Sequence, residues 1–315
     1  MKFLITGAAG FIGSHLTEAL LNLNHKVIGL DNFDPFYAKD VKVQNLKHAL
    51  NNPNFQLLEI DLSNLSSLNS VLNSHEFDAI IHLAAKAGVR NSILKPDEYL
   101  NVNVNGTLNL LEAMRKTGHK KLVFASSSSV YGNNKKVPFS ETDPVDYPIS
   151  PYAASKKAAE QLCYTYHHLY DFDIYTLRFF SVYGPRQRPD MGIHKFFNSF
   201  LHKKPITMFG DGESRRDYTY ISDIIDGTLK AIEHCSGFEI INLGESKTTS
   251  LKSLVSQIKN ISKGETEVIS LPMQPGDVLQ TNADILKAEK LLGYSPKVSI
   301  QEGLQRQFEY LMKSE

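Results

Sequence analysis

The sequence has no tryptophan and only two cysteines among its 315 residues. Cys163 and Cys235 stand far apart without metal-ligand spacing, and the histidines form no His-x-x-x-His pair. These absences argue against a disulfide scaffold and against a metal site. We therefore expect free thiols in a reducing compartment, the cytoplasm, and no bound metal.

The chain also lacks an excess charge of either sign and any long apolar run. Lysine plus arginine and aspartate plus glutamate balance at 34 each, so no overall field would attract nucleic acid or an anionic membrane. No segment approaches the roughly 18 apolar residues of a membrane span. The sequence therefore predicts no nucleic-acid partner, no membrane insertion, and a length sufficient for about two domains.

Residues 2–16, KFLITGAAGFIGSHL, admit two interpretations, a secretory signal or a strand, a glycine turn and a helix. Thr6, Gly7 and Gly10 interrupt the apolar run, whereas a signal needs a continuous apolar block. After the glycines, apolar residues recur at helical spacing, at Ile12, Leu16, Ala19, Leu20 and Leu23. The second interpretation is favoured.

Strand-like and helix-like segments alternate through the first 180 residues. Buried strands are predicted at 26–31, 55–61, 78–85, 121–128 and 173–180, and helical periodicity lies between most of them, as at 104–118. Such alternation predicts a parallel sheet with helices on both faces. We predict an α/β fold, a Rossmann-type doubly wound parallel sheet with a smaller C-terminal α/β substrate domain.

Three glycines, Gly7, Gly10 and Gly13, have the spacing G-x-x-G-x-x-G between the first strand and helix. Gly7 permits a tight turn, Gly10 lets backbone amides approach a pyrophosphate, and Gly13 allows close packing of helix and sheet. A purely structural turn is the alternative. Asp31, eighteen residues after Gly13, favours a dinucleotide site, because a carboxylate there binds ribose hydroxyls and repels a 2′-phosphate. The pattern predicts NAD rather than NADP.

Tyr152 and Lys156, in SPYAASKKAAEQL (150–162), are four residues apart and would share one helix face. A nearby ammonium and the positive nicotinamide would lower the pKa of the phenol from its ordinary value near 10. A core tyrosine beside a solvated lysine is the alternative. The serines at 126–129 favour a catalytic role, because their hydroxyls are available to a substrate oxygen and to the phenol.

In order along the chain, these motifs resemble those of an extended short-chain dehydrogenase/reductase, and within it a nucleotide-sugar epimerase. The resemblance is carried by TGAAGFIGSHL (6–16), DN (31–32), IDL (60–62), HLAA (82–85), NVNGT (103–107), SSSSVYG (126–132), YAASK (152–156), LRFFSVYGPRQRPDM (177–191), FGDGESRRDYTYISD (209–223) and QPGDVLQTNAD (274–284). It implies that residues 1–179 form an NAD-binding Rossmann domain, to which later segments return. It implies that residues 180–315 mainly bind a UDP-sugar.

The resemblance also assigns roles to residues. It implies that Tyr152 is the catalytic base, Lys156 its partner at the nicotinamide ribose, and Ser127 the hydroxyl that relays or orients the sugar proton. The implied cofactor-binding residues are Gly7, Gly10, Phe11, Ile12, Gly13, Asp31, Asn32, Asp61, Leu62, Leu83, Ala84, Ala85, Asn103, Tyr152, Lys156 and Phe179. The implied substrate-binding residues are Ser127, Ser128, Ser129, Tyr152, Ser181, Arg188, Arg216 and Asp277.

Two points qualify these assignments. Most arginines are simply solvated, which is the alternative for Arg188 and Arg216. Relatives carry a further arginine before the Gly-Asp pair, whereas Gln274 and Pro275 stand there in this chain. That segment therefore lacks the arginine with which it would neutralise a phosphate.

The implied reaction is oxidation at sugar C4 to a transient 4-keto sugar, rotation, and reduction on the other face, with NAD regenerated in each turnover. A 4,6-dehydratase would carry an acidic pair before VYG, and a UDP-glucuronate decarboxylase an acidic residue at 129; Ser128 and Ser129 stand there instead. VYGPRQRPDM and MQPGD most resemble UDP-glucuronate 4-epimerases, which predicts conversion of UDP-glucuronate to UDP-galacturonate. The alternatives are a UDP-glucose or UDP-N-acetylglucosamine 4-epimerase, or a non-catalytic NAD-binding sensor.

Members of the family are often homodimers, so a homodimer is expected. The apolar positions of 104–116 and 156–169 could form its interface, although covering the sheet explains them equally well.

Overall fold

The computed structural model describes residues 1–314, and its centre is a seven-stranded parallel sheet. The strand order is β11-β6-β5-β4-β1-β2-β3. The strands are β1 (Lys2–Thr6), β2 (Lys26–Asp31), β3 (Phe55–Glu59), β4 (Ala79–His82), β5 (Lys121–Ser127), β6 (Asp173–Phe179) and β11 (Phe238–Leu243). The direction of winding reverses between β1 and β4, and ligands of such sheets bind outside the carboxyl ends of the strands at this point. The predicted Rossmann-type α/β fold is confirmed.

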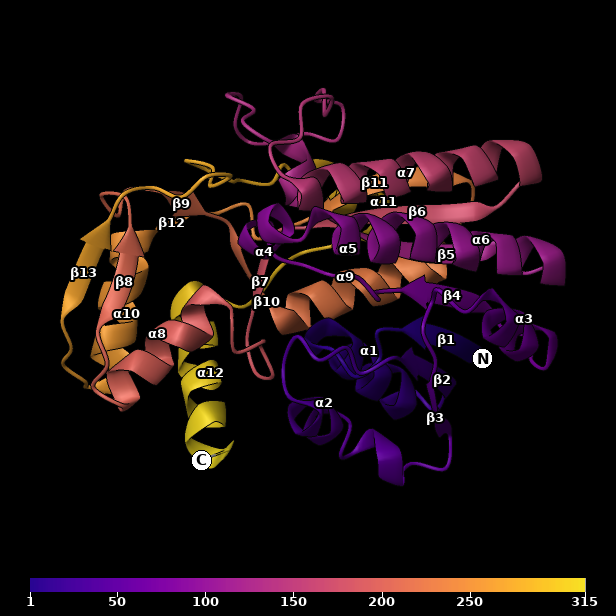
Figure 1. The fold of residues 1–315 in the computed structure, drawn as a ribbon, viewed down its shortest axis with the longest axis horizontal. Coiled ribbons are helices and arrows are strands. Elements are labelled where there is room, and N and C mark those ends of the chain that lie inside the picture. Colours follow the sequence, from indigo (N-terminus) through magenta and orange to yellow (C-terminus); the bar gives the residue numbers. More distant parts are fainter. Residues whose placement is uncertain (315) are drawn as a thin grey trace.

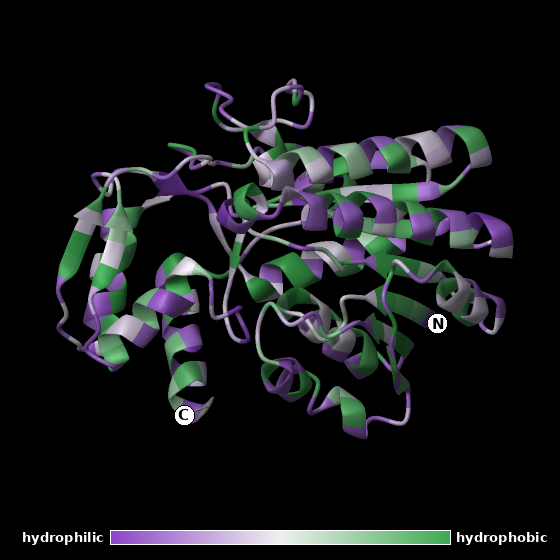
Figure 2. Ribbon diagram, in the orientation of Figure 1, coloured by the Kyte–Doolittle hydropathy of each residue, from purple (hydrophilic) through white to green (hydrophobic). Residues whose placement is uncertain are grey.

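Helices cover both faces of the sheet because the side chains of its strands alternate between two cores. In β1, Phe3 and Ile5 pack in the core that contains α1 (Phe11–Asn22) and α9 (Ile221–His234). Leu4 packs on the opposite face, with α3 (Leu65–Asn73), α6 (Gly106–Thr117) and α7 (Pro151–Tyr170). Figure 2 shows the consequence, since the central strands are mostly green, the colour of apolar residues.

The predicted helices begin and end where their capping residues require. At the start of α7, the Ser150 hydroxyl accepts a hydrogen bond from the N–H of Ala153 at 3.1 Å, and Pro151 occupies the first turn. At the end of α6, Gly118 takes the left-handed conformation, with φ of +82°. The strand predicted at 78–85 is shorter in the structure. It is β4, Ala79–His82, and the chain leaves the sheet after His82.

A second, smaller group of elements lies beyond the carboxyl ends of the strands, away from the N-terminus (Figure 1). It contains α8 (Gly192–Leu201), β8 (Ile206–Phe209), β9 (Arg215–Arg216), β12 (Thr249–Ser250), α10 (Leu251–Ser262), β13 (Val268–Leu271) and α12 (Ile300–Ser314). β8 pairs in parallel with β13, and β9 pairs antiparallel with β12. The chain between β6 and β11 thus leaves the large sheet, builds part of this group and returns.

No helix within residues 1–314 combines the length and apolar character needed to cross a bilayer.

Candidate active site

In the turn after β1, the structure explains why glycine stands at positions 7, 10 and 13. Gly7 has φ of +72°, and a β-carbon there would lie 2.7 Å from the backbone nitrogen of Ala84. A β-carbon on Gly13 would lie 2.1 Å from the Gly7 carbonyl oxygen. These two glycines are required by the fold itself.

Gly10 is different, because the protein does not fill the space beside it. A β-carbon there would meet only the Gly7 oxygen, at 3.2 Å. Gly10 is also the N-cap of α1, and no side chain caps that helix, so Phe11 and Ile12 begin it with backbone N–H groups free for a ligand. An open cradle at a positive helix end suits a diphosphate, and the residues present fit a dinucleotide.

The ends of β2 and β3 are joined by polar contacts. The Asp31 carboxylate accepts hydrogen bonds from the N–H of Ala9 at 3.0 Å and of Phe33 at 2.9 Å. Burial raises the pKa of Asp31, and these two hydrogen bonds oppose the rise. The Asn32 amide donates to Asp61 at 2.6 Å, so three of the predicted cofactor residues, Asp31, Asn32 and Asp61, lie along one edge.

The remaining predicted cofactor residues divide into a lining group and a supporting group. Leu83, Ala84 and Ala85 follow β4 and are half-buried, and Leu62 packs against Gly106. Asn103 is buried, with its side-chain oxygen accepting from the N–H of Lys86. Its amide donates to the Lys86 carbonyl and to the Ser155 hydroxyl, so Asn103 fastens the loop after β4 to α7.

Ser127, Phe179 and Tyr152 come together at the carboxyl ends of β5 and β6. The sheet register sets Ser127 directly beside Phe179. Tyr152, in the first turn of α7, lies close enough to Ser127 for the serine hydroxyl to act on the pKa of the phenol. The neighbouring Ser126 is excluded from this group, because its hydroxyl donates to the buried Glu160 at 2.6 Å.

The surroundings of Tyr152 in the protein itself act on the pKa of its phenol in opposite directions. Burial raises it, while the Ser127 hydroxyl and the charge of Arg188 oppose that rise. The Lys156 ammonium donates to the Ala125 carbonyl oxygen at 2.8 Å. Burial lowers the pKa of Lys156 to about 8. In the protein alone, Tyr152 is therefore a protonated phenol.

The two serines that follow Ser127 are available to a ligand. Ser128 and Ser129 are half-buried and begin a short 3-10 turn, Ser128–Tyr131. The Ser127 hydroxyl donates to the Ser129 hydroxyl at 3.0 Å. Ser181, also half-buried, begins β7 (Ser181–Tyr183) just after Phe179.

Arg188 lies on the Tyr152 side of the site and is mostly buried. Its guanidinium makes two hydrogen bonds to Asp190, at 2.9 and 2.7 Å, and one to the Ala87 carbonyl at 3.1 Å. It also lies over the Phe36 ring, 5.1 Å from the centroid. These contacts contradict the solvated alternative for Arg188.

Arg216 and Asp277 lie together in the second group of elements, with a partner that sequence reasoning missed. Arg216 donates to the carbonyl oxygens of Arg215 and Leu279, and the charge of Asp277 acts on it. Arg90, in α4 (Val89–Leu94), donates to Asp277 at 3.1 Å, and its guanidinium lies 4.1 Å from the centroid of the Phe209 ring. Arg90 stands in the loop region after β4, a strand-end position that could have signalled it.

Arg90 supplies a positive charge next to the segment 274–277, which lacks the arginine of its relatives. Two guanidinium groups, those of Arg90 and Arg216, act on the single carboxylate of Asp277. One positive charge is left uncompensated among these three groups. A cation is thus present beside this segment, although it comes from α4 and not from position 274 or 275.

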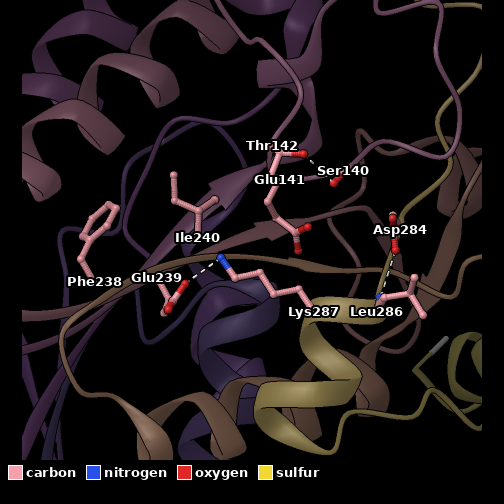
Figure 3. Close-up of a pocket in the computed structure, with 9 residues that line it drawn as sticks. All are labelled: Ser140, Glu141, Thr142, Phe238, Glu239, Ile240, Asp284, Leu286 and Lys287. Carbon is pink, nitrogen blue, oxygen red and sulfur yellow. Dashed lines mark hydrogen bonds and ion pairs between the residues drawn. The ribbon is translucent and has the colours of Figure 1, made fainter.

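A surface hollow of about 410 Å³ lies elsewhere and contains none of the predicted site residues. Figure 3 shows it between β11, the segment at 140–142 and α11 (Leu286–Leu292). Lys287 pairs with Glu239 at 2.7 Å, and the Glu141 carboxylate accepts from the N–H of Asn242 in β11. These groups shield an edge strand, so the hollow has a structural explanation.

A Rossmann-type sheet with a glycine turn, an acidic residue after the second strand and a Ser-Tyr-Lys set defines an extended short-chain dehydrogenase/reductase. Within that class, the chain belongs to the family described as GDP-mannose 4,6 dehydratase, whose model matches residues 4–307.

Individual relatives are named for epimerisation. The chain is 45% identical over 305 residues to a UDP-glucuronate 4-epimerase of Thermodesulfobacterium geofontis, covering 96% of this chain and 94% of the relative. It is similar to a crystal structure of the UDP-glucuronic acid 4-epimerase from Bacillus cereus with UDP-glucuronic acid and NAD, at 41% identity, a TM-score of 0.93 and full coverage of both chains. It is also similar to a UDP-glucose 4-epimerase from Thermotoga maritima with UDP-glucose, at 34% identity, a TM-score of 0.91 and coverage of 100% and 99%.

Proposed function

We propose that this protein is an NAD-dependent UDP-sugar 4-epimerase that converts UDP-glucuronate to UDP-galacturonate. The observation that carries the proposal is the pair of half-buried serines, Ser128 and Ser129, directly after Ser127 and close to Tyr152. The family description names a dehydratase, but the acidic residues that elimination of water would use are absent from positions 128 and 129. The epimerase names of the relatives support the same choice.

The residues that would hold NAD are those of the glycine turn, the first turn of α1, and Asp31 with Asn32 and Asp61. When bound, NAD supplies reversible acceptance of a hydride from the sugar. The protein's own task is to place the sugar C4 hydroxyl at Tyr152 and to manage its proton. The closeness of the Ser127 and Tyr152 hydroxyls supports a proton path from the sugar through these two groups.

Arg188 supports a charged sugar. It is the cation whose charge acts on Tyr152, and Asp190 holds its guanidinium in place. A carboxylate at C6 would lie on the carbon chain close to C4, and a guanidinium is well suited to such a group. The hydroxyls of Ser128, Ser129 and Ser181 would add neutral donors on the same side. An acidic side chain at these positions would instead repel glucuronate.

A neutral sugar is the second candidate, favoured by the likeness to the UDP-glucose 4-epimerase. The fold and the Ser-Tyr-Lys set serve either substrate, because C4 chemistry is the same in both. The difference lies in what Arg188 and the serines bind.

We also propose a division of labour between the two groups of elements. Residues 1–179, with α9 and β11 returning to them, would bind the cofactor, and the rest of 180–315 mainly the UDP-sugar. The pairing of β11 with β6 supports the return. Arg90, Arg216 and Asp277 are suited to the diphosphate of the substrate.

The proposal extends to the assembly and its compartment. Tyr164 and Leu169 of α7 are more than half exposed, at 51% and 58%, which supports a homodimer formed through the outer helices. Static light scattering at micromolar concentration tests it, and a monomer would contradict it. The two free, buried thiols support a reducing compartment such as the cytoplasm.

The reaction is tested by incubating the purified protein with UDP-glucuronate and no added NAD. We expect UDP-galacturonate to accumulate to an equilibrium mixture, with only traces of a pentose product. A protein that forms no C4 epimer even with added NAD would contradict the proposal.

A further inference from the structure

The Asp31 carboxylate occupies a pocket of donors that would bind an anion in its absence. Ala9 donates its N–H to one carboxylate oxygen at 3.0 Å, and Phe33 donates to the other at 2.9 Å. The ammonium of Lys42 lies 4.0 Å from the same oxygen that Phe33 contacts. Asp31 is 7% exposed and Lys42 6% exposed, so solvent screens this arrangement weakly.

Lys42 is held toward Asp31 by its own surroundings. It belongs to α2 (Lys39–Asn45), where its ammonium donates to the Asp34 carbonyl oxygen at 2.8 Å and lies 4.8 Å from the centroid of the Tyr37 ring. Asn45, one turn later, donates to the Ala9 carbonyl and ties α2 to the glycine turn. Within the described chain, Asp31 is the one carboxylate within 4.0 Å of Lys42.

This arrangement changes how the choice between NAD and NADP should work. A carboxylate after the second strand of a Rossmann fold binds the ribose 2′-hydroxyl, and a 2′-phosphate would be directed to the same place. Repulsion by Asp31 is partly cancelled by Lys42, because the two charges are 4.0 Å apart. Asp31 therefore excludes the phosphate largely by filling the donors that would otherwise bind it.

We propose an anion site whose donors are Ala9, Phe33 and Lys42 and which the Asp31 carboxylate occupies. Lys42 then determines cofactor specificity together with Asp31. A small neutral residue at position 31 opens this site to the 2′-phosphate of NADP, so the preference inverts and does not merely weaken. The inference rests on the dinucleotide binding proposed above, and it is independent of which sugar is converted.

The test measures dinucleotide binding and not turnover. Protein freed of nucleotide is titrated with NAD and with NADP by calorimetry, as wild type, Asp31→Ala and Asp31→Ala/Lys42→Met. We expect wild type to prefer NAD, and Asp31→Ala to bind NADP about tenfold or more tighter than NAD, in line with a charge-assisted contact to phosphate. The double variant should lose that preference, because the ammonium is gone.

Lys47 provides the control, because it lies two residues after α2 and is exposed. Asp31→Ala/Lys47→Met should behave like Asp31→Ala. Equal NADP affinity of Asp31→Ala and Asp31→Ala/Lys42→Met would overturn the proposal, as would a persisting preference of Asp31→Ala for NAD.

A single variant covers the case in which Asp31→Ala does not fold. Lys42→Met in the wild-type background should lower affinity for NADP by a larger factor than affinity for NAD, because Asp31 then repels the phosphate without a counter-charge. Equal losses for both dinucleotides would overturn the proposal. If the wild-type protein binds NAD but forms no epimer, the proposed function is contradicted. The proposed anion site is not contradicted by that result.

Discussion

The pKa of the Tyr152 phenol is set by opposing effects of its surroundings. Burial favours the neutral phenol, whereas the Ser127 hydroxyl and the Arg188 charge favour the phenolate. The sequence alone showed a tyrosine and a lysine on one helix face, and it predicted that the lysine would act on the phenol. In the structure the lysine ammonium donates to the backbone carbonyl of Ala125, and the lowering of the phenol pKa by the lysine and a bound nicotinamide stays a prediction.

The first prediction concerns the phenol oxygen. Tyr152→Phe keeps the ring and its packing and removes only the group that exchanges the proton, so the fold and NAD binding should survive. We expect turnover to fall by about 100-fold or more, the usual contribution of a general base. Initial rates and a thermal melt with and without NAD measure both effects. Turnover near that of wild type would remove Tyr152 from the mechanism.

The second prediction concerns pH and Lys156. Burial lowers the pKa of Lys156 to about 8, so its ammonium is lost as the pH rises through 8. If that charge serves the reaction, kcat/KM should fall on the alkaline side with a midpoint near pH 8. A profile that stays flat to about pH 10, the range of an ordinary lysine, would contradict this account.

The expected fall in kcat/KM above pH 8 cannot be caused by unfolding that follows from deprotonation of Lys156. The unfolded lysine keeps its proton up to about pH 10.4, so between pH 8 and that value the unfolded chain binds more protons than the folded one. The contribution of Lys156 to the free energy of unfolding therefore rises with pH in this window. Thermal melts across the same range serve as the control.

Among the elements, α7 is fastened to the sheet by a buried ion pair. Arg178 of β6 makes two hydrogen bonds to Glu160 of α7, at 2.9 and 2.8 Å, and Ser126 of β5 donates to the same carboxylate. Both charged side chains are 1% exposed. Because α7 carries Tyr152 and β5 carries Ser127, this contact holds together the two elements that build the site.

The third prediction follows from this pair. Glu160→Ala leaves the Arg178 guanidinium buried without a carboxylate partner, and we expect the free energy of unfolding to fall by about 3–5 kcal/mol. Glu302→Ala is the control, because Glu302 pairs with Arg306 at an exposed surface of α12 and should cost less than about 1 kcal/mol. Urea unfolding measures both variants, and equal losses would contradict the assignment.

The strands and helices of the large sheet could be predicted because local patterns determine them. The stretch KVIGLD forms β2 over the residues predicted, 26–31, since it is a short apolar run bounded by polar residues. Asn103 shows the limit of such reasoning. Its motif suggested a place near the cofactor, whereas its hydrogen bonds to Lys86 and Ser155 depend on how distant segments pack.

At the scale of the whole molecule, Arg90 links the two groups of elements. It lies in α4, after β4 of the large sheet, and reaches Asp277 and the ring of Phe209, which closes β8. The position of Arg90 after a strand end could have signalled it, but its partners could not be predicted from local patterns, because they lie more than 100 residues further along the chain. The proposed site would thus draw on both groups, since only the fold brings Arg90 and Arg216 together.

The fourth prediction tests this link. If the uncompensated charge of Arg90 and Arg216 serves the diphosphate, Arg90→Ala should raise KM for the UDP-sugar about tenfold or more, as loss of a charge-assisted hydrogen bond does. The effect on kcat should be small, because the side-chain contacts of Arg90 are with Asp277 and Phe209 and not with Tyr152. Steady-state kinetics separate the two constants, and a fall in kcat with KM unchanged would contradict the role.

We expect the protein to prefer a UDP-sugar with a carboxylate at C6. The most direct measurement compares kcat/KM for UDP-glucuronate, UDP-glucose and UDP-N-acetylglucosamine with one preparation of enzyme. Arg188 and the serines at 128, 129 and 181 predict that UDP-glucuronate is converted at least about 100-fold more efficiently, since a buried guanidinium discriminates strongly for a carboxylate partner. Conversion of either neutral sugar at least as efficiently as UDP-glucuronate would contradict the preference for a carboxylate at C6.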